Sequence, residues 1–135
     1  MYLKEALEKQ INFCMNIPSY RCGIFVKDYK RGTYIMDGIK DSISLISDNV
    51  ESVRNGNEKV ICFKNGSCIK ILSVNNCNTI RGQKFNGAII DNDSNMEVAH
   101  CIIYPMLRPM FNDETQEFEP FQNVRDRVYF VFIMW

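Results

Sequence analysis

The sequence has no long apolar run and no excess of charge, and each absence narrows what the protein can be. The longest apolar run is the last eight residues, 128–135, well short of the roughly 18 residues that a membrane helix needs. The first ten residues lack the apolar stretch of a secretion signal, so we expect a cytoplasmic protein. Lysine plus arginine and aspartate plus glutamate each number 16, a balance that gives no global sign of a nucleic-acid binder.

The sequence also lacks the cysteine spacing of a metal site or a disulfide framework. It has six cysteines and one histidine, but no C-x-x-C pair. If Asn65-Gly66 forms a two-residue turn, Cys62 and Cys68 point to opposite faces of the hairpin and cannot bond to each other. We therefore expect reduced, mostly buried thiols that pack as small apolar side chains.

What is present is the composition of one folded domain. The chain has 135 residues, of which 46% are hydrophobic and 24% charged, an ordinary globular balance with enough length for a core. We find no internal repeat, so we expect a single α/β domain over residues 1–135.

Two amphipathic helices are predicted in the first half of the chain. Leu3, Leu7 and Ile11 lie on one stripe and predict a helix over 2–14. Asp37 is a suitable N-cap for a second helix that ends at Asn55-Gly56. Its apolar seam, at spacings of four and three, is Ile39, Ile43, Ile46, Val50 and Val53. Between the helices we expect strands at 22–26 and 33–36, separated by a turn at 30–32.

The most informative stretch is 59–93. Two apolar segments, 60–63 and 68–72, flank Asn65-Gly66 and predict a hairpin. After an Arg81-Gly82 loop, the apolar residues 88–90 run directly into Asp91-Asn92-Asp93. A buried parallel strand presents a carboxylate in this way at its C-terminal edge, where open α/β sheets bind ligands.

The remaining segments complete the expected fold. Ser94-Asn95-Met96-Glu97 fits a capping box and predicts a helix through Tyr104. Residues 109–123 are polar and acidic, and we expect a long loop there. Residues 128–135 do not alternate, which favours a strand buried on both faces. The expected architecture is a central, at least partly parallel sheet flanked by helices.

The order of hairpin, Arg-Gly loop, apolar strand and acidic end resembles the Walker B half of the ATPase domain in phage large terminase subunits, the motors that package DNA. The resemblance covers residues 37–104 and implies a truncated fold of the P-loop ATPase type. In that family, the carboxylate that ends the acidic strand holds the hydrated Mg²⁺ on ATP, and Asp91 matches it. The family's Arg-Gly pair shapes the loop that borders the nucleotide, and Arg81-Gly82 matches that pair.

Two departures from the family pattern concern catalysis. Asn92 stands where the family has the glutamate that polarises the attacking water, and an amide cannot act as a general base. The phosphate-loop motif G-x-x-x-x-G-K-[ST] occurs nowhere in the chain. A purely structural interpretation of residues 91–94 also stands, because Asp, Asn and Ser are typical of a strand exit followed by a helix cap.

These observations favour a non-catalytic binding protein of a phage or mobile element, with no cofactor and no membrane contact, in the host-cell cytoplasm if a phage encodes it. Its expected partner is a protein, either an oligomeric ATPase such as a packaging motor or a second copy of itself. An alternative is a phosphoesterase or nuclease that uses Asp91 and Asp93 to bind Mg²⁺. A further alternative is a small structural virion component. Arg81, Gly82 and Lys84 belong to a polar loop that could touch a phosphate backbone, although the neutral net charge does not support nucleic-acid binding.

Overall fold

The computed structural model describes residues 1–74, 82–92 and 99–132. Its centre is a six-stranded sheet with the strand order β2-β3-β4-β1-β5-β8. In chain order these strands are β1 Arg21–Val26, β2 Val50–Asn55, β3 Lys59–Phe63, β4 Cys68–Ser73, β5 Gly87–Asp91 and β8 Val128–Val131. Neighbours among β4, β1, β5 and β8 are parallel, whereas β2, β3 and β4 form an antiparallel meander. The expected α/β class with a partly parallel central sheet is confirmed.

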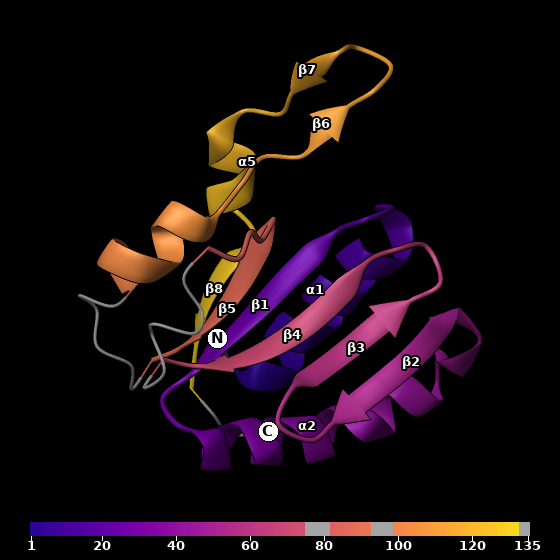
Figure 1. Ribbon diagram of the computed structural model, residues 1–135, viewed down its shortest axis with the longest axis vertical. Coiled ribbons are helices and arrows are strands. Elements are labelled where there is room, and N and C mark those ends of the chain that lie inside the picture. The colour runs from indigo at the N-terminus through magenta and orange to yellow at the C-terminus, as the bar shows by residue number, and fades with distance from the viewer. Residues whose placement is uncertain (75–81, 93–98, 133–135) are drawn as a thin grey trace.

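Helical segments cover both faces of this sheet. α1 (Leu3–Asn16) and α2 (Tyr29–Ser44) lie behind it in Figure 1 and close one core against β1, β3 and β4. The opposite face of β1 and β5 packs against a π-helical turn (Ala99–Ile103), a 3-10 turn (Tyr104–Met106) and α5 (Phe121–Arg125). The sheet is therefore the middle of three layers, as is usual where parallel strands are buried.

The acidic-tipped strand β5 is central, as predicted. It lies between β1 and β8, and all five of its residues are buried. Ile89 belongs to the core beneath α1 and α2, whereas Ile90 belongs to the core on the other face. Since both faces of β5 need apolar side chains, its sequence shows a continuous apolar run rather than alternation.

The second helix begins earlier than the sequence predicted. Its N-cap is Asp28, whose side chain accepts a hydrogen bond from the backbone N–H of Arg31 at 3.0 Å. The turn expected at 30–32 and the strand expected at 33–36 are therefore wrong. The capping bond decides the structure here, because it satisfies one of the free amides of the first helical turn.

The same helix also ends earlier, at Ser44. A 3-10 turn follows at Ser47–Asn49, and the chain then enters β2, which pairs with β3. Val50 and Val53, which continued the helical spacing, lie in this strand and not in the helix. Two valines at a spacing of three fit either structure, and the hydrogen bonds that β2 makes with β3 decide in favour of the strand.

The β3–β4 hairpin has a longer turn than predicted. The backbone N–H of Gly66 donates to the carbonyl of Phe63 at 3.1 Å, and the N–H of Phe63 donates to the carbonyl of Ser67 at 2.8 Å. Gly66 has a φ of +88°, which makes it the left-handed residue of a bulged turn that shifts the register by one. Cys62 therefore lies directly opposite Cys68, and the expectation that the two point to opposite faces is wrong.

The segment 109–123, which was expected to be a loop, contains a hairpin. β6 (Phe111–Asn112) pairs antiparallel with β7 (Glu117–Phe118). Figure 1 shows this hairpin standing away from the sheet, beyond α5. Strands of two residues are too short to produce an alternating pattern, so no periodicity in the sequence predicts them.

The C-terminal strand β8 lies at the edge of the sheet. Within the described residues it pairs with β5 alone, and Val128, Tyr129 and Phe130 are half-buried. The expectation of a strand buried on both faces is met in part, because Tyr129 packs against one core and Val128 and Phe130 against the other, while all three stay half-buried. Residues 133–135 and the capping box expected at 94–97 lie outside the described residues.

Candidate functional site at the ends of β1 and β5

The carboxyl ends of β1 and β5 meet where an open α/β sheet binds its ligands. The chain leaves β1 through α2 on one face of the sheet and continues to β2, β3 and β4. It leaves β5 by the opposite face and continues to β8. Connections that diverge in this way open a crevice at the ends of the two strands. Asp91, the last residue of β5, and Lys27, the first residue after β1, lie at this crevice.

Asp91 is held there by an ion pair with Arg31. The carboxylate is buried, with the residue 2% exposed. Arg31, in the first turn of α2, donates from Nη1 to Oδ2 at 2.9 Å and to Oδ1 at 3.1 Å. The backbone N–H of Lys27 donates to Oδ2 at 3.1 Å. Both carboxylate oxygens therefore accept hydrogen bonds, and the negative charge of Asp91 is matched by an adjacent positive charge.

The loop from β1 to α2 occupies the place that a phosphate loop takes in a strand–loop–helix unit. A phosphate loop points several backbone N–H groups at the phosphate oxygens. Here the N–H of Lys27 donates to Asp91, while those of Arg31 and Gly32 donate to Asp28, at 3.0 and 3.3 Å. These three amides bond within the chain instead of pointing at a ligand.

The nearest glycine, Gly32, lies in the first turn of α2 and not in a phosphate-binding loop. A Cβ built on Gly32 would lie 3.4 Å from Cγ2 of Ile71, an ordinary van der Waals contact where α2 packs against β4. Thr33 follows it, and its hydroxyl donates to the carbonyl of Tyr29 within the helix at 3.3 Å. The segment thus forms an ordinary first helical turn, which agrees with the absence of the phosphate-loop motif from the sequence.

Of the other predicted site residues, the structure describes two, Gly82 and Lys84. Arg81 and Asp93 lie outside the described residues. Gly82 is exposed with a φ of +87°, as a turn requires, and Lys84 is exposed. Neither contributes a described contact to Asp91.

Sequence reasoning missed Arg31, because the segment around it was assigned to a turn. The signal that could have found it is Asp28, an N-cap type of residue three positions before the arginine. Once the helix is started at Tyr29, Arg31 falls in the turn next to the end of β5.

A hollow of about 420 Å³ adjoins the same edge of the sheet, beside β4. Its wall includes the buried Lys59, whose Nζ donates to Oδ1 of Asn55 at 3.1 Å and to the carbonyl of Gly56 at 3.3 Å. The ammonium also lies 4.5 Å from the centre of the Tyr29 ring. The charge of Lys59 is thus stabilised by groups of the protein itself.

Among the described residues, no other cluster of side chains has the arrangement of a metal site or an activated nucleophile. No three His, Cys, Asp or Glu side chains among them converge as metal ligands would. Burial raises the pKa of the Cys14, Cys22 and Cys68 thiols, so these three stay protonated near neutral pH and are poor nucleophiles. The five cysteines of the described residues are all free thiols, although only Cys14 and Cys22 are fully buried.

Comparison with known proteins supports the fold. No family model matches the chain, and the search of curated proteins finds no match. No helix among the described residues is long and apolar enough to span a membrane. Among solved structures, the chain is similar to the large terminase ATPase domain of Thermus phage P74-26, with a TM-score of 0.61 and 13% sequence identity. The match covers 95% of this chain and 53% of that chain, so this chain spans about half the length of its structural neighbour. The resemblance in sequence order is thus matched by a resemblance in structure, and the chain has the fold of a terminase ATPase domain.

Proposed function

We propose that this chain is a non-catalytic binding protein of a phage or mobile element, which uses a terminase-like ATPase fold to act on a macromolecular partner such as a packaging motor. The observation that carries the proposal is the ion pair between Arg31 and Asp91. In P-loop ATPases the aspartate at this kind of strand end holds Mg²⁺. A guanidinium hydrogen-bonded to both oxygens of Asp91 places a fixed positive charge where that cation would sit.

Two further features support the absence of hydrolysis. The amides of Lys27, Arg31 and Gly32, at the end of β1 and the start of α2, bond to Asp28 and Asp91, so these three do not form a cradle for phosphate. Asn92 follows Asp91 and has no basic group with which to activate water. A fold that keeps its sheet and loses these groups is suited to recognition rather than turnover.

The alternative enzyme would bind Mg²⁺ through Asp91 and Asp93 and cleave phosphate esters. It would require Arg31 to leave the buried carboxylate before a cation could bind there. No contact among the described residues favours that rearrangement, so the non-catalytic function is preferred.

Steady-state phosphate release with Mg²⁺ and ATP tests the proposal, with an active terminase ATPase as the positive control. The wild-type chain and its Asp91→Ala variant should both show only background release. Turnover that Asp91→Ala abolishes would overturn the proposal. A parallel assay with a phosphodiester substrate and Mg²⁺ or Mn²⁺ tests the alternative enzyme in the same way.

The partner needs a separate experiment. The chain should form a complex with the large terminase subunit encoded in the same genome, measured by sedimentation velocity of the two proteins alone and mixed. An additive sedimentation profile would exclude the packaging motor as the partner while leaving the hydrolysis result unchanged.

A further inference from the structure

The β6–β7 hairpin exposes aromatic side chains far from the site at β1 and β5. Phe111 and Phe118 face each other across the two strands, with ring centres 5.0 Å apart. They are 44% and 67% exposed, and the nearby Phe121 is 40% exposed. Clustered exposed aromatic residues are a recurrent property of protein interaction sites, because burying them against a partner releases water from a large apolar area.

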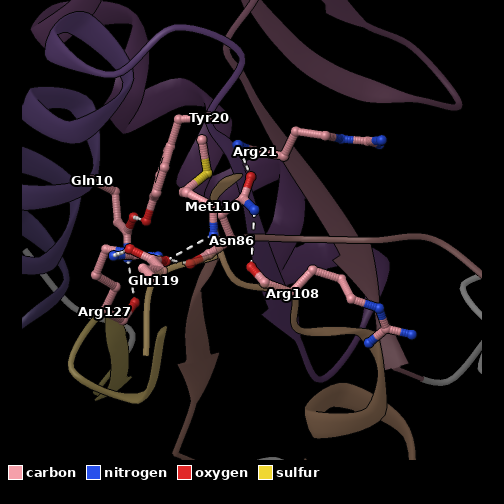
Figure 2. A network of polar contacts seen from close by, with 8 residues as sticks. All are labelled: Gln10, Tyr20, Arg21, Asn86, Arg108, Met110, Glu119 and Arg127. Atoms are coloured by element: carbon pink, nitrogen blue, oxygen red, sulfur yellow. Dashed lines mark hydrogen bonds and ion pairs between the residues drawn. The ribbon is translucent and has the colours of Figure 1, made fainter. Parts of the chain in front are cut away.

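The base of the hairpin is held by a buried polar network, shown in Figure 2. Arg127 forms a two-pronged ion pair with Glu119, and its Nε donates to the carbonyl of Asn86 at 3.1 Å. Glu119 in turn accepts from the backbone N–H of Met110 at 2.9 Å. The two ends of the hairpin are therefore attached to each other and to the start of β5.

The tip of the hairpin is also held in one conformation. Oδ1 of Asn112 accepts hydrogen bonds from the backbone N–H groups of Glu114 and Thr115, at 2.9 and 3.3 Å. A two-stranded hairpin by itself is only marginally stable in water. These contacts hold it ready for binding, which lowers the entropic cost of docking.

A groove runs between the hairpin and the turn that joins α1 to β1. It encloses about 670 Å³. Its apolar wall comprises Ile17, Pro18, Met110 and Phe111. Asp113 and Glu114 line the same groove, and both are exposed.

The charged residues that line the groove are all acidic: Asp113, Glu114 and Glu119. Residues 109–124 contain four carboxylates, Asp113, Glu114, Glu117 and Glu119, and no lysine or arginine. Glu119 is paired with Arg127, and the other three are exposed and carry no described ion pair. A partner that fits must therefore bring an apolar group for the groove floor and positive charges for its rim.

We propose that this groove and the exposed face of the β6–β7 hairpin dock a protein segment in which lysine or arginine residues flank a large apolar side chain. The inference rests on the proposed function, since it names the surface through which a non-catalytic protein reaches its partner. The surface lies at the opposite ends of the strands from Asp91, so docking there leaves the Arg31–Asp91 pair in place.

Fluorescence anisotropy with a labelled synthetic peptide tests the proposal. The probe carries two arginines on each side of a Leu-Phe pair. One matched peptide replaces the arginines with glutamate, and another replaces Leu-Phe with Ser-Ser. The wild-type chain should bind the first peptide saturably, at least tenfold more tightly than either matched peptide, and binding should weaken with added salt. Failure to bind the first peptide, or equal binding of all three, would overturn the proposal.

Variants locate the binding surface. Phe118→Ser and the pair Asp113→Lys with Glu114→Lys should each weaken binding at least tenfold. The matched controls are Asp41→Lys in α2 and Leu45→Ser just after α2, both at exposed positions. They should leave binding of the peptide unchanged. Thermal melting of each variant confirms folding. An equal loss of binding in the control variants would overturn the assignment of the surface.

Sedimentation velocity separates this partner from a second copy of the chain. A dimer that Phe118→Ser converts to monomer would show that the surface is occupied by the chain itself, and would overturn the proposal. Because the ATPase assay does not involve this surface, failure of the docking site and failure of the proposed function are distinguishable.

Discussion

The Arg31–Asp91 pair is asymmetric at the scale of single residues. The side chain of Asp91 is 1% exposed, whereas that of Arg31 is 30% exposed. Arg31 therefore stays partly hydrated when the aspartate is lost, whereas both oxygens of Asp91 lose a hydrogen bond when the arginine is lost. A buried charge without its partner is among the most destabilising changes a protein can undergo.

Arg31→Ala should accordingly destabilise the protein by about 3 kcal/mol. Asp91→Asn should cost less, since the amide oxygen can still accept hydrogen bonds and the Arg31 side chain is partly exposed to water. Chemical denaturation of both variants measures the difference. Equal costs for the two substitutions would contradict the asymmetry of the pair.

Glu119 predicts a dependence of stability on pH. Burial raises the pKa of its carboxyl, but hydrogen bonds from Arg127 and from the Met110 backbone outweigh burial and hold the pKa below its ordinary value of 4.5. Its stabilising contribution is therefore full above pH 4.5 and is lost as the pH falls through the lower value of the folded state. Glu119→Gln should melt well below wild type at pH 6, and the gap should narrow by pH 3. A gap that stays constant with pH would contradict this role of the charge.

The elements of the structure differ in how far their sequences determine them. β5 was predictable because a short apolar run that ends in an aspartate has few other uses in a globular domain. The second helix was not, because Val50 and Val53 continue its spacing yet lie in β2. Its true start depends on the cap at Asp28. The pairing of Arg31 with Asp91, residues 60 positions apart, could not be predicted, because it exists only after β1 and β5 have paired.

Ile89→Asp tests the central position of β5. Ile89 is fully buried, and an isolated carboxylate there should cost several kcal/mol, on the order of a domain's whole stability. We expect insoluble or unfolded protein. Val53→Asp is the matched control in the exposed edge strand β2, and it should change stability by only about 0.5 kcal/mol. A normally melting Ile89→Asp protein would show that β5 is peripheral.

Gly87 tests the network at the other end of β5. A Cβ at this glycine would collide with the Tyr20 hydroxyl, which donates to Oε1 of Gln10 at 2.7 Å. Gly87→Ala should therefore cost about 2 kcal/mol or more, because the network must break or the strands must separate. Gly56→Ala is the control, since nothing lies within 4 Å of a Cβ there. Circular-dichroism melts of the two variants measure the difference in stability. Similar melting temperatures for Gly87→Ala and Gly56→Ala would argue against a tightly packed network at Gly87.

The whole molecule presents two separate surfaces, one at each end of the parallel strands. At the C-terminal ends of β1 and β5, Asp91 is bound to Arg31 and to the backbone of Lys27. At the other end, the network around Glu119 and Arg127 supports a hairpin with exposed aromatic residues. Only the first of these surfaces was predictable from sequence, since the second depends on strands too short to leave a pattern. This division underlies our proposal that a terminase-like fold here binds a partner rather than hydrolysing ATP.

Isothermal titration calorimetry with ATP and Mg²⁺ tests this account most directly. The wild-type chain should show no saturable binding, because Arg31 occupies the carboxylate that would hold the cation and the amides of Lys27, Arg31 and Gly32 bond within the chain. Saturable binding at micromolar ATP that Asp91→Ala abolishes would contradict it.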